Sequence, residues 1–302
     1  MLWFRNIQLY RLAVDHALAA ATIDAALAKR PFMPCGPSDL QTSGWVAPAA
    51  HAPDLLAYAW QNTVLVQLRA EEKILPGAVI KRETAKRVAE IEARENRKVG
   101  RREQKEMREL IISELLPRAF TRQSDTRALV DLQNNLVLVD ASSPAKAELL
   151  LSLLRESLGS LPTRILQTHT TPQTAMTLWL ESADAGAFDL GQDCAMAYPG
   201  DDGAKAKLTR QPMSGDEVQQ HLTAGKLVTQ LALSWQDRVA FVLTEKLELK
   251  RLSMMDTLQD EIRGADAADA EALFNTGLTL MLGEARQLVP TLIDALGGEQ
   301  DI

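Results

Sequence analysis

The sequence predicts an α+β protein with an elongated subunit that is built of several parts. Three observations lead to this prediction. Short segments in which apolar and polar residues alternate, typical of antiparallel strands, occur in both halves of the chain. A highly charged helical stretch covers residues 78–115, and residues 271–296 carry the apolar spacing of a mostly buried helix. We therefore expect antiparallel sheets, a long projecting charged helix and a helical C-terminal part.

Residues 1–76 form the first predicted part, which is α+β. The opening residues 2–12 mix aromatic and polar positions like a strand, and Asp15 is placed to cap a helix that ends before Pro31. Proline, glycine and serine are frequent after this helix, which predicts loops with a short strand around Trp45 and Val46. Residues 63–68 alternate and include β-branched side chains, so they predict another strand that runs on toward the end of this part.

Residues 77–122 form the second part, a helical finger. Residues 78–115 contain no proline, a single glycine at Gly100, and many opposite charges three or four positions apart. This pattern predicts one long helix or two helices broken near Gly100. As one helix, at about 1.5 Å per residue, it would reach on the order of 50 Å. Its apolar positions are sparse, so we expect it to project from the body.

Residues 123–212 form the third part, again α+β. Two alternating runs around Asn134–Asn135 predict a hairpin, because asparagine tolerates positive φ in a tight turn. The Ser-Pro pair at 143–144 begins a predicted helix that continues through Leu158. The segment 205–211 is interpreted as a loop with a small basic cluster.

Residues 213–302 form the fourth part, in which a sheet is followed by helices. Three period-2 segments predict neighbouring antiparallel strands: 227–234, 238–244 and 247–252. The helix predicted over residues 271–296 is expected to break near Pro290, and the glycines at 297–298 terminate it.

Charge is distributed unevenly along the chain. The net charge is −7, which by itself argues against a nucleic-acid partner. Residues 69–127, however, contain 16 Lys and Arg against 11 Asp and Glu, and the remainder holds 17 against 29. This segregation predicts a basic working surface on an acidic body.

The composition indicates a folded protein of a reducing compartment. Cys35 and Cys194 lie far apart without CxxC spacing, which argues against disulfides and thiolate metal sites. No apolar run approaches the roughly 18 residues of a membrane span, and charges interrupt the apolar N-terminal residues. We expect a cytoplasmic protein without membrane contact.

Motifs that carry catalysis are absent from the sequence. It contains no GxxxxGK[ST] loop, no GxGxxG after a strand, no GxSxG and no HExxH, and its four histidines show no paired ligand spacing. We therefore expect no enzymatic activity, no cofactor and no metal site. A nuclease that assembles acidic ligands from distant segments is left open, because one sequence cannot exclude it.

The basic finger is the main candidate for function, as a surface that contacts phosphates. The predicted DNA-binding residues are Lys81, Arg82, Lys86, Arg87, Arg94, Arg97, Lys98, Arg101, Arg102 and Lys105, with Arg108 beside them. The alternative is a solvated helix whose charges pair with one another. No pattern for base-specific readout is present, so binding would not depend on DNA sequence.

A hydrophobic residue follows the charged helical stretch in an unusual setting. The segment LLPRAF contains Pro117, which ends the helix and presents Phe120 on a turn beside Arg118. Either Phe120 packs into its own core, or it is an aromatic anchor at a subunit contact.

Several segments, in order along nearly the whole chain, resemble the RdgC family of recombination-associated proteins. The residues that carry the resemblance are MLWFRN at the start, PCG at 34–36, GW at 44–45, EEKILP at 71–76, LLPRAF at 115–120, LRESLGSLP at 154–162, AGKLVTQLALSW at 224–235, LKRL at 249–252 and GE at 283–284.

This resemblance implies a ring-shaped homodimer that encircles duplex DNA, binds single and double strands with little sequence preference, and limits RecA-promoted strand exchange. It also implies association with the nucleoid. Phe120, with Arg118 beside it, and the pair Arg210 and Gln211 match family positions at the contact that closes the ring. The family also has Lys at the first position of that pair, so Arg210 retains the charge. An adaptor that binds a protein partner and makes no DNA contact is the alternative.

Overall fold

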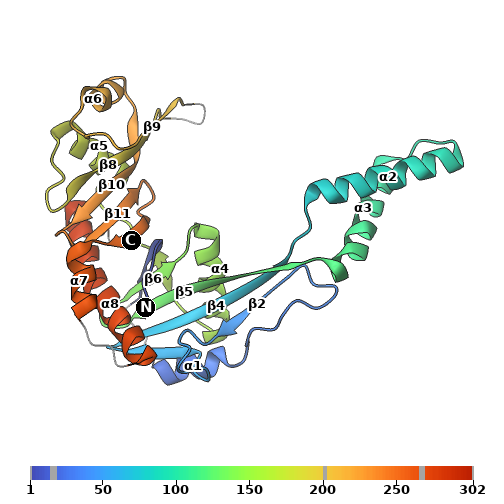
Figure 1. The fold of residues 1–302 in the computed structure, drawn as a ribbon, viewed down its shortest axis with the longest axis horizontal. Helices are drawn as coiled ribbons and strands as arrows, with labels where there is room; N and C mark the ends of the chain where they lie inside the picture. The colour runs from blue at the N-terminus through green and yellow to red at the C-terminus, as the bar shows by residue number, and fades with distance from the viewer. Residues whose placement is uncertain (1, 14–18, 200–202, 265–268, 301–302) are drawn as a thin grey trace.

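The computed structural model describes residues 2–13, 19–199, 203–264 and 269–300, and the side chains of residues 261–264 are not described. Asp15, the predicted helix cap, lies outside these residues. Figure 1 shows an open arc, with one limb formed by the α2 and α3 helices and the other by the C-terminal strands and helices. The described helices are α1 (Ala20–Leu27), α2 (Gly77–Glu95), α3 (Arg101–Leu115), α4 (Pro144–Leu158), α5 (Pro172–Ser182), α6 (Asp216–Thr223), α7 (Asp256–Gly264) and α8 (Ala270–Ala295), with a 3₁₀ turn η1 (Leu116–Arg118).

The described strands join in one antiparallel sheet, which confirms the α+β class. The strands are β1 (Ile7–Leu12), β2 (Gln41–Val46), β3 (Ala57–Trp60), β4 (Thr63–Lys73), β5 (Thr121–Asp131), β6 (Leu136–Asp140), β7 (Thr163–Ile165), β8 (Asp189–Ala197), β9 (Lys205–Leu208), β10 (Leu227–Trp235), β11 (Val239–Thr244) and β12 (Leu249–Met254). The order is β2-β4-β5-β6-β1-β12-β11-β10-β8-β9, with β3 also paired to β4 and β7 to β1. Helices cover both faces.

Each face of the sheet has its own hydrophobic core, because side chains alternate along a strand. On one face, α1 and α4 pack over residues such as Trp45, Val66 and Val139. On the other, α5 and α8 pack over a larger core that includes Leu129 and Trp235. The two cores hold the sheet and its helices together as the body of the protein.

The sheet narrows where β1 meets β12. Between these strands the register has one residue pair, Ile7 with Leu249, and the Leu252 amide donates to the Arg5 carbonyl. By contrast, β1 pairs with β6 over five positions. Helix α8 spans this narrow seam, since its Asn275 accepts a hydrogen bond from Tyr58 of β3 while its core residues also pack in the C-terminal half.

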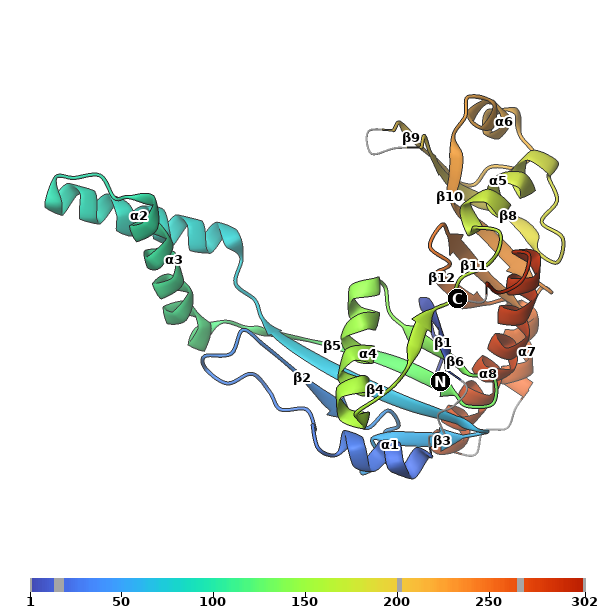
Figure 2. The ribbon, with the colours of Figure 1, turned by 180° about the vertical axis from the view of Figure 1, so that it is seen from behind.

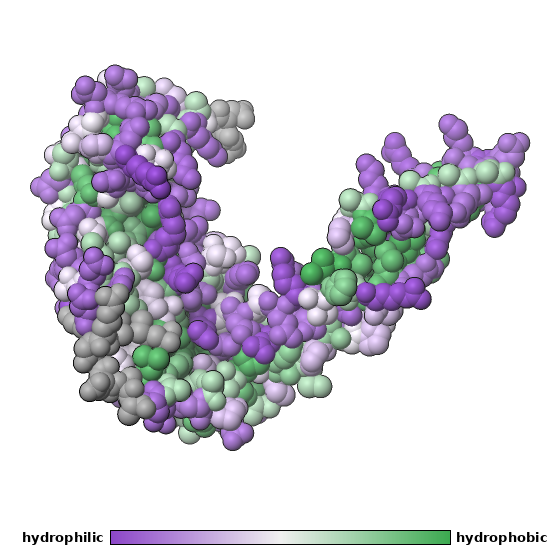
Figure 3. Space-filling view, in the orientation of Figure 1, coloured by the Kyte–Doolittle hydropathy of each residue, from purple (hydrophilic) through white to green (hydrophobic). Residues whose placement is uncertain are grey.

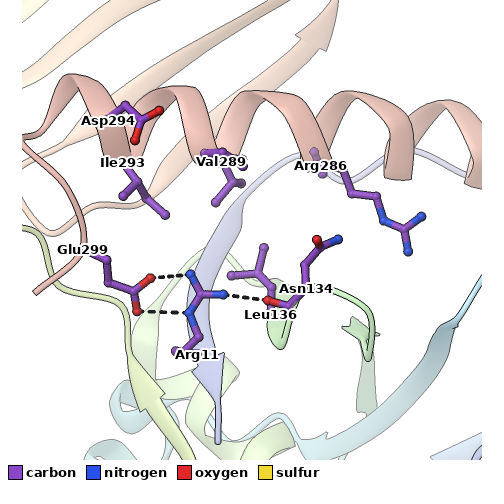
Figure 4. A pocket seen from close by; sticks show the side chains of 10 residues that line it. Arg11, Asn134, Leu136, Arg286, Val289, Ile293, Asp294 and Glu299 are labelled. Atoms are coloured by element: carbon purple, nitrogen blue, oxygen red, sulfur yellow. Dashed lines mark hydrogen bonds and ion pairs between the residues drawn. The ribbon is translucent and has the colours of Figure 1, made fainter. Parts of the chain in front are cut away.

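The C-terminal end of the described chain is bound to the first strand. Arg11 of β1 forms an ion pair with Glu299 and donates to the Asn134 carbonyl, as Figure 4 shows. Arg164 of β7 reaches the same Glu299 carboxylate at 3.0 Å. Arg11, Asn134 and Glu299 line a cavity of about 240 Å³ under α8. The last residues therefore help to hold α8 against the sheet.

Most predicted elements are confirmed. The helix at 143–158, the Asn134–Asn135 turn, in which Asn135 has φ of 51°, and the three C-terminal strands all form. The loop predicted at 205–211 is wrong in part, because β9 occupies its first four residues and pairs with β8.

The predicted break near Pro290 is also wrong, since α8 continues through it to Ala295. Pro290 lies on the exposed side of the helix, where water can replace the hydrogen bond that proline cannot donate, while its neighbour Val289 is buried. Packing of the buried face outweighs the local preference. Gly297 and Gly298 follow the helix with φ of 81° and 96°, as expected for a helix stop.

Candidate nucleic-acid interface

The charged finger is a pair of helices, the second of the two predicted forms. Helix α2 ends at Asn96, whose φ of 50° is left-handed, and α3 starts after Gly100. A small core holds the helices together: Val99, Met107 and Ile111 are buried, and Val88, Ile91 and Leu115 pack against them. Figure 1 shows the pair beyond the ends of β4 and β5, at a distance from α5 and α8.

Half of the predicted DNA-binding residues are paired with carboxylates of the same helices. The ion pairs are Arg82–Glu83, Arg87–Glu114, Arg94–Glu95, Arg97–Glu95, Arg97–Glu103 and Arg102–Glu106. All these side chains are substantially exposed, so the pairs contribute little to stability individually. They do reduce the positive charge that these arginines present to a partner.

Two of these arginines fix the geometry of the finger. Arg97 donates to Glu103 at 2.7 Å and to Glu95 at 2.8 Å, which joins the loop to both helices. The hydrogen bond with Glu103, and then that with Glu95, raises the pKa of Arg97, and the pKa of both carboxyls is lowered in turn. Arg87 of α2 contacts Glu114 of α3 at 2.9 Å. These pairs act mainly as links between the helices.

The remaining cations of the finger carry unbalanced charge. Within the residues that the structure describes, these side chains form no ion pair: Lys81, Lys86, Lys98, Arg101, Lys105 and Arg108. Arg101, Lys105 and Arg108 follow the i, i+4, i+7 spacing, which places them on one face of α3. Arg108 also lines a groove of about 640 Å³ between α2 and α3, with Lys81 on the other wall.

Phe120 lies on an exposed apolar surface. Phe120 is 84% exposed, which contradicts the interpretation that it packs into its own core. Arg118 beside it is exposed as well. Its carbonyl accepts from the Ile74 amide, and the neighbouring Lys73 amide donates to the Leu40 carbonyl. Ile74 and Leu40 are 45% and 57% exposed. Three exposed apolar side chains, which we call the Phe120 patch, therefore come from adjacent backbone segments.

Figure 3 shows hydrophobic side chains where the α2/α3 pair joins the sheet and hydrophilic ones at its far end. Sequence reasoning singled out Phe120 alone. Leu40 and Ile74 are brought to it by hydrogen bonds between segments that are distant in the sequence, so no local pattern indicates them.

Arg210 and Gln211 lie on the opposite limb of the arc. They follow β9, and their amides donate to the Asp193 carboxylate and the Gln192 carbonyl of β8, each at 3.1 Å. Arg210 has φ of 56°. Figure 1 places β9 and the start of β5, which follows Phe120, on different limbs. One subunit therefore does not bring the four predicted dimer-contact residues together.

Three further observations concern metal binding, thiol chemistry and the membrane. Across the described part of the chain, no group of three or more His, Cys, Asp or Glu side chains is placed to hold a metal ion. Cys194 is buried, and burial raises the pKa of its thiol to about 11. None of the helices in the described ranges is long and apolar enough to span a bilayer.

Comparison with known proteins supplies the family. Residues 2–299 match the family model described as "Putative exonuclease, RdgC". A protein of Laribacter hongkongensis named "Recombination-associated protein RdgC" is 46% identical over 99% of this chain and 100% of its own. Proteins with the same name from Pseudomonas paraeruginosa and Dechloromonas aromatica are 42% and 38% identical, over 99% of this chain and 98% of each of them. Because the match extends over nearly the whole sequence, this chain belongs to the RdgC family.

Proposed function

We propose that this protein binds single- and double-stranded DNA without sequence preference, encircles it as a homodimer and limits RecA-promoted recombination. Family membership supports the connection with recombination. The observation that carries the DNA-binding proposal is the face of α3 with Arg101, Lys105 and Arg108, none of which is paired with a carboxylate in the described structure.

Contacts from this face would go to phosphates. Lysine and arginine side chains release condensed counterions when they neutralise phosphates, and such contacts carry no sequence information. Among the paired arginines, Arg87 and Arg97 link the two helices, and all five carry charge that a carboxylate already balances in part. The proposed binding therefore needs neither a base-specific contact nor a chemical step.

The Phe120 patch supports the proposed dimer. Exposed aromatic side chains surrounded by other apolar groups are typical anchors of protein interfaces. In a two-fold dimer, a contact between the Phe120 patch of one subunit and the Arg210–Gln211 turn of the other would occur twice. Because these two surfaces lie on opposite limbs of the arc, two such contacts would close a ring.

A closed ring on DNA would compete with a recombinase filament for the same phosphate backbone. In this proposal the protein limits recombination by occupancy, and it is found on the nucleoid because it stays on DNA. The overall charge of −7 does not oppose this, since the ring would expose its basic side chains to the DNA and its acidic ones outward.

The DNA-binding proposal is tested with two triple variants of equal charge change. The first is Arg101→Gln, Lys105→Gln and Arg108→Gln, and the matched control is Arg82→Gln, Arg94→Gln and Arg102→Gln. If the unpaired face contacts duplex phosphates, the steepness of log K against log salt falls in the first variant by up to about 3 for each subunit on the DNA, at roughly 0.9 per contact. The control should change it less, since its arginines are partly neutralised.

Equal slopes in both variants would contradict the assignment of this face. An absence of binding to duplex and single strands at low salt would favour the protein adaptor. The same samples, incubated with Mg²⁺ or Mn²⁺ and followed by fragment length, test the exonuclease named in the family description.

The dimer proposal is tested with Phe120→Asp, which places a charge in the Phe120 patch. Sedimentation velocity should show a shift from dimer to a smaller species, and retention on closed circular DNA at moderate salt should be lost. Leu178→Asp, at a 53% exposed leucine of α5, is the control. A Phe120→Asp protein that sediments as the parent does would rule out this contact.

A further inference from the structure

The groove between α2 and α3 is open to a partner. Its volume of about 640 Å³ lies within the range of roughly 300–1,000 Å³ that is typical of binding pockets. Figure 2 shows the α2/α3 pair from behind, and in this view, as in Figure 1, no other described helix or strand lies along it. Within the described part of the subunit, the groove is therefore not covered by another element.

One face of α2 forms the longer wall of the groove. The lining positions of α2 follow the helical repeat at i, i+4, i+7, i+8, i+11, i+12 and i+15, and they are Gly77, Lys81, Thr84, Ala85, Val88, Ala89 and Glu92. At about 1.5 Å per residue, this wall is roughly 22 Å long. A helix of about 15 residues has the same length.

The middle of this wall is apolar and accessible. Ala85 and Ala89 are exposed, and Val88 is half-buried because it also packs against the small core of the α2/α3 pair. The apolar side chains of a protein partner would be removed from water on this surface, which favours association. A phosphate backbone would bury little apolar surface there. The wall therefore favours a protein segment over a nucleic acid.

The charged groups of the groove are cations without a carboxylate partner. Lys81 of α2 and Arg108 of α3 line the groove, and neither forms an ion pair within the described residues. At the other end, Glu92 accepts from the Val99 amide at 3.0 Å, and Gln104 donates to the Val99 carbonyl at 3.1 Å. These two side chains close the loop between the helices. Lys81 and Arg108 are left to recognise a partner, which must be acidic.

We propose that this groove docks a helical segment of another protein, with apolar side chains on one face and Asp or Glu beside them. The apolar side chains would lie over Ala85, Val88 and Ala89, and the carboxylates would pair with Lys81 and Arg108. An amphipathic helix that lies in an apolar groove is a common mode of peptide recognition. The complementary charges would fix the register of the segment. The inference goes beyond the proposed DNA binding and does not depend on it.

Arg108 belongs to two surfaces, the groove and the face of α3 that we propose for phosphate contacts. A docked carboxylate would neutralise Arg108, and the negative charge of the segment would repel phosphates nearby. Docking would therefore weaken DNA binding, so an acidic protein segment would act as a regulator of DNA occupancy.

The test uses the full chain and a fluorescein-labelled synthetic peptide of about 14 residues, or roughly four helical turns. The peptide carries Leu at i, i+3, i+7 and i+10, Glu beside these positions and Ala elsewhere. One control peptide has the same composition in an order that spreads Leu around the helix, and another has Gln in place of each Leu. Fluorescence anisotropy without DNA should show saturable binding of the first peptide, roughly tenfold tighter than of either control.

One variant of the protein tests the apolar wall. Ala85→Glu places a carboxylate on this wall and beside Lys81, and it should lower the peptide affinity by roughly tenfold or more. Ala93→Glu is the matched control, since Ala93 is an exposed alanine of α2 outside the lining. Near-parental thermal midpoints would show that both variants are folded, as expected for Glu at exposed helical positions.

A second variant tests the cations. Lys81→Gln with Arg108→Gln removes both from the groove and should lower the peptide affinity by roughly tenfold. The control of equal charge change is Lys86→Gln with Lys98→Gln, because these lysines belong to the same region, lie outside the lining and form no ion pair in the described structure. The control should stay within about threefold of the parent protein.

Several outcomes would overturn the proposal. They are a parent protein that does not bind the first peptide, equal binding of the reordered peptide, and equal losses in the groove variants and their controls. Self-association that Ala85→Glu abolishes and Ala93→Glu preserves, without peptide binding, would identify a second copy of this chain as the occupant instead. A loss of duplex affinity in Ala85→Glu alone, again without peptide binding, would assign the groove to DNA.

The proposal and the proposed function fail separately. Peptide binding is measured without DNA, so its absence leaves the DNA-binding proposal standing. A parent protein that binds the peptide but no DNA would support the groove and contradict the proposed function.

Discussion

The sheet body and the α2/α3 pair are stabilised in different ways. The body encloses two extensive cores under helices on both faces. The pair buries Val99, Met107 and Ile111, and otherwise relies on links such as Arg87–Glu114 and the two ion pairs of Arg97. A region with so few buried apolar contacts opens locally at lower free energy than the body. The proposed DNA-contacting surface thus lies on a region that needs less energy to rearrange than the sheet body.

The largest effect is expected where the body contains a buried charge. Asp131 is 1% exposed and accepts from Arg286 of α8 at 2.7 Å. Arg286→Met leaves this carboxylate unpaired, which should cost about 3 kcal/mol or more in the free energy of unfolding. Urea denaturation measures the loss, and the double variant with Asp131→Asn should recover much of it. A single variant as stable as the parent would contradict this role.

The same pair predicts a pH dependence. Burial would raise the pKa of Asp131, but hydrogen bonds from Arg286 and Asn134 outweigh burial and hold the pKa below its ordinary value of 3.8. A lowered folded-state pKa contributes stability above that value, and the contribution is lost as the pH falls toward the folded pKa. In Arg286→Met the carboxyl loses the largest contribution that lowers its pKa while burial still raises it, so the folded and unfolded pKa values move together. The stability lost on acidification, measured by urea denaturation across a pH series, should therefore be smaller in Arg286→Met than in the parent protein.

An intermediate loss of stability is expected in the α2/α3 helices. Met107→Ala removes a buried side chain from its small core and should destabilise the helices by about 2 kcal/mol. Hydrogen exchange should speed up in α2 and α3 while the amides of β5 and β6 keep their protection. If Met107→Ala increased exchange in the strands as well, the pair and the body would be one cooperative unit.

The smallest effect on folding is expected from Glu103→Gln. This carboxyl is partly exposed and restrains Arg97, so its loss should leave the urea midpoint unchanged within error. Arg97 would then be less neutralised, and DNA affinity should rise with a steeper salt dependence by up to one phosphate contact. Glu148→Gln, on α4, is a control of equal charge change. Unchanged DNA binding in Glu103→Gln would show that Arg97 does not face DNA.

Local patterns predicted most elements but not their assembly. The Asn134–Asn135 turn and the 143–158 helix follow from short-range preferences, which depend on neighbouring residues. The central place of β1, between β6 and β12, depends on pairing across the whole chain and has no local signal. The continuity of α8 through Pro290 likewise depends on tertiary packing.

The sequence likewise located the candidate interface but not the contacts within it. Composition located the charged finger, and Pro117 correctly indicated that Phe120 is presented outward. Composition could not show which cations are paired with carboxylates, because some partners are distant in the sequence. Arg87, for example, contacts Glu114, which lies 27 positions further along the chain.

The narrow contact between β1 and β12 has a mechanical consequence. A sheet resists bending through its rows of hydrogen bonds, and this row is short. Helix α8 lies across this short row and is joined to β3 by the hydrogen bonds Tyr58–Asn275 and Trp60–Thr279. A force that spreads the two limbs would load these side-chain bonds, the Arg286–Asp131 pair and the core that crosses the seam. The stiffness of the arc at this point therefore depends on α8 and the core beneath it more than on strand pairing.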